Sequence, residues 1–135
     1  MKEKGKISAV VLVNDNKEVL LYLRDDNLEI PYPNHWSFIG GHIEKNETPL
    51  EALIRETMEE IGYKIDNPVY LGLFDDQVGH DVYFYKCYIN KRIEDICLTE
   101  GQRLKYFSLD EILATKNMPE PIKKIVSINK EKIFN

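Results

Sequence analysis

The sequence predicts an α/β (α+β) fold in which helices cover a mixed β-sheet. Apolar runs of strand length recur along the chain, helical patterns lie between them, and one helix has strong start and stop signals at both ends. The chain has 135 residues, close to the ~150 expected for one domain, and shows no repeat or linker. We therefore expect a single domain over residues 1–135.

Runs rich in aliphatic and β-branched residues, bounded by turn residues, predict the strands. We expect them at residues 7–13, 19–23, 36–39, 69–74, 82–89 and 103–107. The segment between the second and third runs is rich in Pro, Asp and Asn, which predicts a long loop.

The best-defined helix is expected at Pro49–Ile61. Thr48 is its N-cap and Glu51 completes a capping box, while proline at the first position sacrifices no hydrogen bond. Gly62 is placed to end the helix in a left-handed cap. Two further helices are expected, a short one that Ser108 caps and a C-terminal one at about 121–132.

The helix has two distinct faces when it is drawn at about 100° per residue. The face expected to meet the core carries Leu50, Leu53, Ile54, Thr57, Met58 and Ile61. The other carries Glu56, Glu59 and Glu60, with the small Ala52 expected to leave these carboxylates open to a ligand.

Like charges at these spacings destabilise a helix by about 0.2–0.5 kcal/mol per pair. A hard divalent cation would relieve the repulsion, and Mg²⁺ or Mn²⁺ prefers oxygen ligands. The alternative that composition alone leaves open is a solvated acidic face.

Overall charge and composition exclude several classes of function. Asp plus Glu number 23 and Lys plus Arg 18, giving a net charge of −5, which disfavours a nucleic-acid polymer as partner. The apolar run at 7–13 is far shorter than the ~20 residues that span a bilayer, and it resembles no signal peptide. Only two cysteines are present, Cys87 and Cys97, so we expect reduced thiols and a cytoplasmic protein without membrane contact.

The segment 41–63 resembles the Nudix box. Gly41 is followed after five residues by Glu47 and, after seven more, by Arg55-Glu56, then Glu59-Glu60 and Gly62. All residues whose identity the box pattern fixes are present. Thr57 and Tyr63 occupy aliphatic positions of the pattern, and Ile39 stands where many relatives have Pro; we interpret all three as local packing differences.

The resemblance implies an α/β/α sandwich and a metal-dependent hydrolase that cleaves a nucleoside diphosphate linked to another group. It implies that Glu56, Glu59 and Glu60 bind Mg²⁺ or Mn²⁺, together with the carbonyl of Gly40 or Gly41. Glu56 or Glu59 is then also a candidate general base. Glu47 and Arg55 are expected to pair and hold the loop against the helix, and Gly62 to end it.

A second local similarity, to the MutT branch, is Thr99-Glu100-Gly101-Gln102 followed by Tyr106-Phe107. It implies that Glu100 assists at the metal centre as an acid or base; the alternative is an exposed loop glutamate. The small size favours MutT-like hydrolysis of a canonical or oxidised nucleoside triphosphate to monophosphate and pyrophosphate. ADP-ribose or a nucleotide sugar is the alternative substrate.

Substrate contacts are expected from loops. Arg24 is a candidate phosphate ligand because arginine binds phosphate bidentately, and a salt bridge to Asp25 or Asp26 is the alternative. His35 is a candidate for stacking on a base, and His80 for a place beside the site. Relatives specific for oxidised guanine carry an Asn where this chain has Pro119, and Asn117 is the candidate replacement.

Two other classes of protein compete with this interpretation. A Nudix-fold ligand-binding regulator usually lacks box glutamates, whereas this chain keeps them. An isomerase of allylic diphosphates would need a catalytic cysteine, and Cys87 is expected in mid-strand. Nothing in the sequence identifies a protein partner, so a monomer or a homodimer is expected.

Overall fold

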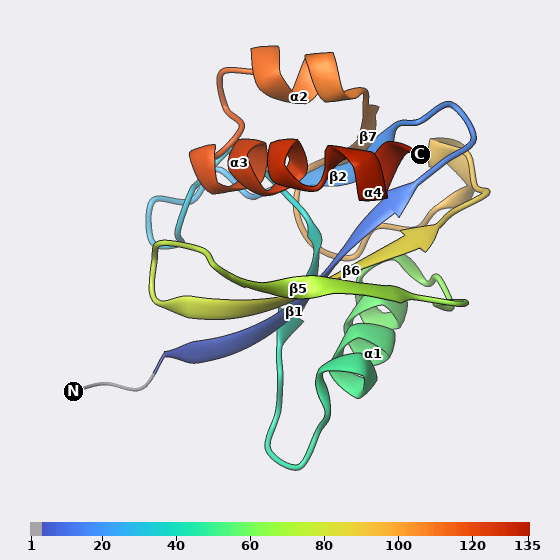
Figure 1. Cartoon of the computed structure of the whole chain (residues 1–135). Helices are drawn as coiled ribbons and strands as arrows, with labels where there is room; N and C mark the ends of the chain where they lie inside the picture. The colour runs from blue at the N-terminus through green and yellow to red at the C-terminus, as the bar shows by residue number, and fades with distance from the viewer. Residues whose placement is uncertain (1–3) are drawn as a thin grey trace.

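The computed structural model describes residues 4–135 and has three layers: α1 on one face of a β-sheet, and α2, α3 and α4 on the other (Figure 1). The strands are β1 (Gly5–Val13), β2 (Val19–Leu23), β3 (Trp36–Ser37), β4 (Ile39–His42), β5 (Val69–Asp75), β6 (His80–Tyr88) and β7 (Arg103–Phe107). The helices are α1 (Pro49–Ile61), α2 (Leu109–Ala114), α3 (Glu120–Ile128) and α4 (Lys130–Phe134), with a 3₁₀ turn at Ile93–Asp95. The predicted α+β class is confirmed.

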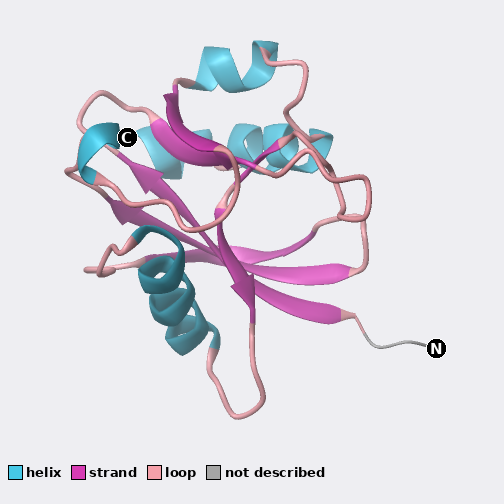
Figure 2. Ribbon diagram, turned by 180° about the vertical axis from the view of Figure 1, so that it is seen from behind, coloured by secondary structure: helices cyan, strands magenta, loops and turns pink. Residues whose placement is uncertain are grey.

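The sheet is mixed, as predicted. Its strands follow the order β3-β2-β1-β6-β5, β4 pairs with β1, and β7 pairs with β2. Strands β1 and β6 are parallel, and the other pairs are antiparallel. Strand β4 pairs with residues 7–10 of β1, and β2 pairs with Leu12 and Val13 farther along the same strand. Figure 2 shows the twisted sheet from behind.

Two hydrophobic cores lie on the two faces of the sheet. Val10, Leu12 and Leu20 point toward α1, where Leu53 and Ile61 meet them. Residues of opposite parity, such as Val11 and Leu21, point toward the other helices. The alternation follows from the two-residue period of a strand, and every residue of β2 is buried because both of its faces are covered.

Helix α1 begins and ends where the sequence predicts. The Thr48 hydroxyl accepts from Glu51 N at 3.1 Å, and the Glu51 carboxylate accepts from Thr48 N at 2.9 Å. Gly62 caps the other end at φ 65°, a left-handed conformation that glycine adopts without strain.

The predicted faces of α1 are wrong in part. Leu50, Ile54 and Met58 are 39%, 42% and 46% exposed, whereas Ala52 and Glu60 are buried. The helix is rotated toward its acidic side because β4 packs there, and Ala52 provides close contact with the sheet instead of an opening for a ligand.

Three other boundaries differ from the expectation. The single strand expected at 36–39 is two strands, β3 and β4, because the pairing partner changes at Phe38: β3 pairs with β2, and β4 pairs with β1. The C-terminal helix is interrupted at Asn129, whose side chain donates to Ile125 O at 2.8 Å. His80 begins β6 instead of lying in the loop before it.

No helix within residues 4–135 combines the length and the apolar character that crossing a membrane requires.

Candidate active site

The loop between β4 and α1 is fixed by Arg55. Its guanidinium donates to both carboxylate oxygens of Glu47, at 2.7 and 3.0 Å, and to the carbonyl of His42 at 3.1 Å. The hydrogen bonds from Arg55 lower the pKa of Glu47 to about 2, so this carboxylate is ionised at neutral pH. The predicted pair is therefore present, and it holds the loop onto the first turns of the helix.

Arg55 also binds two of the helix glutamates. It donates to Glu56 at 2.9 Å and to Glu59 at 3.3 Å. Glu56 is largely buried, with 16% of its side chain exposed, whereas Glu59 is 59% exposed. The Arg55 guanidinium thus contacts both Glu56, which lies toward β4, and Glu59, which lies toward solvent.

Glycine at position 41 is required by the carboxylate of Glu56. A Cβ at this position would lie 2.4 Å from the Glu56 carboxyl carbon, well inside van der Waals contact. The absence of a side chain therefore lets the backbone of β4 approach the carboxylate.

Glu60 is the most unusual acid of the site. It is 6% exposed, and its carboxylate accepts a hydrogen bond from Gly40 N at 3.3 Å. Burial, assisted by the nearby charges of Glu56 and Glu100, raises its pKa to about 8. Carboxylates that repel one another in a poorly solvated place favour a proton or a cation between them.

The loop that carries Glu100 is attached to the end of α1. Thr99 donates from its hydroxyl to Glu59 O at 2.8 Å and from its backbone to Glu60 O at 2.9 Å. Gly101 has φ 80°, and a Cβ there would meet Leu23 O at 2.6 Å. This tight fit brings Glu100 to the same pocket as Glu56 and Glu60. The local similarity of residues 99–102 to the MutT branch predicts that position.

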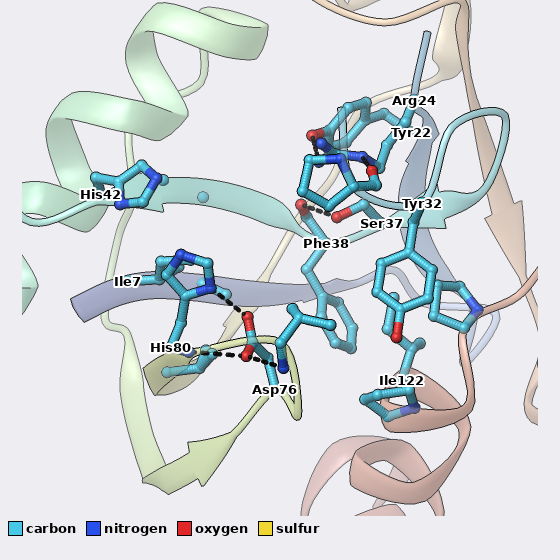
Figure 3. Close-up of a pocket in the computed structure, with 18 of the residues that line it drawn as sticks. Ile7, Tyr22, Arg24, Tyr32, Ser37, Phe38, His42, Asp76, His80 and Ile122 are labelled. Atoms are coloured by element: carbon cyan, nitrogen blue, oxygen red, sulfur yellow. Dashed lines mark hydrogen bonds and ion pairs between the residues drawn. The ribbon is translucent and has the colours of Figure 1, made fainter. Parts of the chain in front are cut away.

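These acids lie at one side of a pocket of about 560 Å³. The rest of its lining is mainly apolar and aromatic: Ile7, Ala9, Trp36, Phe38, Val82, Pro119, Pro121, Ile122 and Ile125. Figure 3 shows Tyr32 and Ile122 on one side of the pocket, His42 and His80 on the other, and Phe38 between them. The pocket therefore joins an anionic region to an apolar region that suits a flat ring.

Two histidines line the pocket near the first residues of β1 and β6. The rings of His42 and His80 are 5.3 Å apart, edge to face. Asp76 orients His80: its Oδ2 lies 2.8 Å from Nδ1, while its Oδ1 accepts from the backbone of Val78 and His80. The carboxylate of Asp76 thus fixes the ring of His80 through both its side chain and its backbone.

The predicted substrate contacts divide into two groups. Arg24 and His80 line the pocket, and Arg24 donates to Pro31 O at 2.9 Å and to the Tyr22 hydroxyl at 3.3 Å instead of pairing with Asp25 or Asp26. His35 and Asn117 lie outside the lining: His35 Nδ1 is 2.8 Å from Pro33 O, and the Asn117 amide donates to Asn34 O at 2.9 Å. Glu59 is also outside it.

Sequence reasoning missed Tyr22, His42, Glu44 and Asp76 as pocket residues. Tyr22 has a usable signal, because residues two apart in β2 share a face and Arg24 follows it. Asp76 has none, because its role depends on the turn that returns β5 to β6.

The donor set fits a hard divalent cation. Glu56 and Glu60 offer carboxylate oxygens, and the backbone of Gly40 and Gly41 lies close to these oxygens. The raised pKa of Glu60 indicates that a positive charge is favoured there. Among residues 4–135, no group of three or more acidic, histidine or cysteine side chains is arranged as a complete cage for an ion. Mg²⁺ commonly completes its shell with waters and substrate phosphate.

The fold and this box of glycine, glutamate and arginine define the class of protein. The chain belongs to the Nudix family, whose NUDIX domain model matches residues 4–127.

Individual relatives agree with this assignment. The chain is 38% identical over 80 residues to an 8-oxo-dGTP diphosphatase of Proteus vulgaris, a match that covers 59% of this chain and 66% of the relative. It is 42% identical over 69 residues to the m7GpppN-mRNA hydrolase NUDT17 of Xenopus laevis, covering 50% of this chain and 23% of the relative. The chain thus spans less than two thirds of either relative.

Solved structures match over nearly the whole chain. The MutT protein of Methanosarcina mazei Go1 has a TM-score of 0.81 at 19% identity, covering 97% of this chain and 96% of the neighbour. The NUDIX domain of Shewanella oneidensis NrtR, complexed with ADP ribose, has a TM-score of 0.77 at 17% identity, covering 98% and 90%. At these identities the likeness establishes the fold.

Proposed function

We propose that this protein is a Mg²⁺- or Mn²⁺-dependent pyrophosphohydrolase that cleaves a nucleoside triphosphate to the monophosphate and pyrophosphate. The observation that carries the proposal is the cluster of Glu56, Glu60 and Glu100 in a pocket whose remaining lining is mainly apolar and aromatic. A nucleotide has the same division, because its phosphates need cations and its base needs a dry, flat contact.

Glu56 and Glu60 would hold the metal, with Glu59 joining them when it leaves Arg55. The bound metal would neutralise the phosphates and lower the pKa of a bound water. Glu56 or Glu59 is the candidate that accepts a proton from the attacking water, with Glu100 as a supporting acid or base. Arg55 positions these glutamates, and Arg24 is placed to bind a phosphate at the edge of the pocket.

The apolar region favours recognition of the base by shape and stacking. Within the described residues, no Asn or Gln side chain lines the pocket, and Pro119 and Pro121 occupy the stretch in which Asn117 was the expected reader of an oxidised base. We therefore expect activity on canonical nucleoside triphosphates at least as high as on 8-oxo-dGTP. The two cysteines are free thiols, which favours a reducing compartment such as the cytoplasm.

The test is a product assay with Mg²⁺ over canonical and oxidised nucleoside triphosphates, ADP-ribose, nucleotide sugars and dinucleoside polyphosphates. Monophosphate plus pyrophosphate from triphosphates is the expected result, with EDTA abolishing it. Turnover restricted to ADP-ribose or nucleotide sugars would keep the chemistry and refute the substrate. Binding without turnover of any of these compounds would refute the assignment as an enzyme and favour a regulatory module.

A further inference from the structure

The loop between β2 and β3 has an unusual backbone conformation beside the pocket. Tyr32 lies in this loop with φ 50°, a left-handed conformation that bulky side chains rarely adopt. Pro33 follows it, and a residue before proline favours extended backbone instead. Such a conformation persists only where the surrounding structure imposes it, and it is most frequent at ligand-binding sites. The conformation of Tyr32 therefore indicates a loop that is held in place for the pocket.

Tyr32 forms part of the pocket wall. It lines the pocket together with Arg24 and Pro31 of the same loop. Figure 3 shows its ring extending from the loop toward Ile122 of α3, in the apolar region. The ring of His35 packs edge to face against it, with the centroids 5.7 Å apart. The ring of Tyr32 is thus the part of this loop that a flat group in the pocket would meet.

Gln102 joins the Tyr32 loop to the loop that carries Glu100. Its side-chain amide donates to Arg24 O at 2.8 Å and to Asn34 Oδ1 at 2.9 Å, so it connects the start of the Tyr32 loop to a residue near its end. Its backbone N–H donates separately to Leu23 O at 2.8 Å. Because that backbone bond already holds the Glu100 loop against β2, the side chain has a task of its own.

Asn117 holds the same part of the Tyr32 loop from another segment. Its amide donates to Asn34 O at 2.9 Å, and its carbonyl accepts from Trp36 N at 3.0 Å. Asn34 itself has φ 56°, a conformation that asparagine tolerates better than most residues. Three segments of the chain therefore meet at Asn34, just beyond Tyr32, through the Asn34 network: Asn34, Gln102 and Asn117.

Arg24 fixes the loop on the other side of Tyr32. Its Nε donates to Pro31 O at 2.9 Å, and its backbone N–H donates to His35 O at 2.9 Å. The residue before Tyr32 and the residues after it are thus both bonded to neighbouring structure. This explains how the strained conformation of Tyr32 is maintained.

We propose that Gln102 and Asn117, acting through Asn34, position Tyr32 as a fixed wall of the pocket and so determine which flat group the pocket accepts. Gln102 and Asn117 are positioning residues, and Tyr32 is the residue that touches the substrate. A loop that is ordered before the substrate arrives lowers the entropic cost of binding. That the flat group is the base of a nucleotide rests on the proposed function, whereas the fixing of the loop does not.

The kinetics of ATP hydrolysis with Mg²⁺ test the positioning role. Gln102→Ala should raise KM at least about 5-fold, because two hydrogen bonds are lost. It should keep kcat within about two-fold of the wild type, because the backbone still holds the Glu100 loop. Asn16→Ala is the matched control: Asn16 is exposed in the turn between β1 and β2, and this variant should match the wild type. A lower kcat with an unchanged KM in Gln102→Ala would overturn the proposal, because the side chain would then act on the Glu100 loop.

A double-mutant cycle tests whether Gln102 acts through Tyr32. Tyr32→Ala alone should raise KM at least about 10-fold, because the base loses an aromatic contact. In the Tyr32→Ala background, Gln102→Ala should raise KM by less than about two-fold more, because the ring that it positions is absent. Equal effects of Gln102→Ala in the two backgrounds would overturn the claim that it acts through Tyr32.

Hydrogen exchange without substrate tests the Asn34 network independently of the reaction. In Gln102→Ala the amides of residues 25–35 should exchange at least about 5-fold faster, whereas those of α1 should keep wild-type rates. Unchanged exchange in this loop would overturn the proposal. A wild-type protein that cleaves neither ATP nor any other triphosphate would refute the proposed function, and the exchange rates would still decide whether the network fixes the Tyr32 loop.

Discussion

Replacing the buried carboxylate of Glu60 by the isosteric amide, Glu60→Gln, should stabilise the metal-free protein at alkaline pH. The amide keeps an oxygen for the Gly40 N–H and removes a charge that is 6% exposed and lies near Glu56 and Glu100. At pH 5 the two proteins should have similar stability, because the wild-type carboxyl is then protonated.

The sign follows from proton linkage. The pKa of Glu60 is about 8 in the folded protein against an ordinary 4.5, so the folded state binds more protons than the unfolded state between these values. Wild-type stability should therefore fall as pH rises through this window, and the variant should lack that component. At about 1.4 kcal/mol per pH unit, the free energies of unfolding of the variant and the wild type should differ by at most about 5 kcal/mol at alkaline pH. Relaxation of the protein around the charge and entry of water reduce this difference to about 2–4 kcal/mol.

Urea unfolding in EDTA at pH 5 and pH 8.5 measures the effect. We expect equal free energies of unfolding at the lower pH and a more stable variant at the higher pH. Adding Mg²⁺ at pH 8.5 should stabilise the wild type more than the variant, because the ion replaces the proton. A variant that is less stable than wild type at pH 8.5 in EDTA would refute the reasoning about burial and repulsion.

Three further substitutions test the packing around the site. Thr57→Val should raise the free energy of unfolding by about 1 kcal/mol, because the Thr57 hydroxyl is the one buried side-chain polar atom among the described residues that lacks a hydrogen-bond partner. Urea titration measures the change, and a destabilised variant would contradict the prediction. Arg55→Ala should lower that free energy by about 1–2 kcal/mol and turnover at least about 10-fold, since Glu47, Glu56 and Glu59 lose their common donor; unchanged melting and rate would make Arg55 a bystander. Gly41→Ala should lower turnover at least about 10-fold, because the new Cβ displaces the Glu56 carboxylate. The control is Gly62→Ala, whose new Cβ meets no neighbour within 4 Å; it should lose about 1 kcal/mol of stability, because φ is 65° there, and keep its turnover. Equal activity in the two variants would refute the argument that the backbone at Gly41 must approach Glu56 closely.

Local signals predicted most of the fold. The ends of α1 depend on Thr48, Glu51 and Gly62, all of which act within a few residues of the helix, so the sequence reveals them. The rotation of α1 does not depend on such signals. Hydrophobicity alone places Leu50, Ile54 and Met58 in the core, but β4 packs against the acidic side and buries Glu60 instead.

The residues of the site likewise divide into those that local sequence spacing reveals and those that it does not. The box spacing identifies Glu47, Glu56, Glu60 and Arg55, because a single loop and helix hold them together. Asp76 and Tyr22 enter the pocket from strands remote in sequence, through turns and sheet order that no local pattern contains. The roles of all the predicted site residues stay predictions, and three of them, Glu59, His35 and Asn117, lie outside the pocket lining.

The most direct test of the central claim is the turnover of a nucleoside triphosphate at saturating Mg²⁺ by the wild type, Glu56→Gln and Glu59→Gln. The account predicts that each substitution lowers kcat by at least about 100-fold with an unchanged melting temperature, because both carboxylates act through charge on the metal or the attacking water. Near-wild-type turnover by Glu56→Gln would contradict the claim that the acidic cluster beside Gly41 is the catalytic centre.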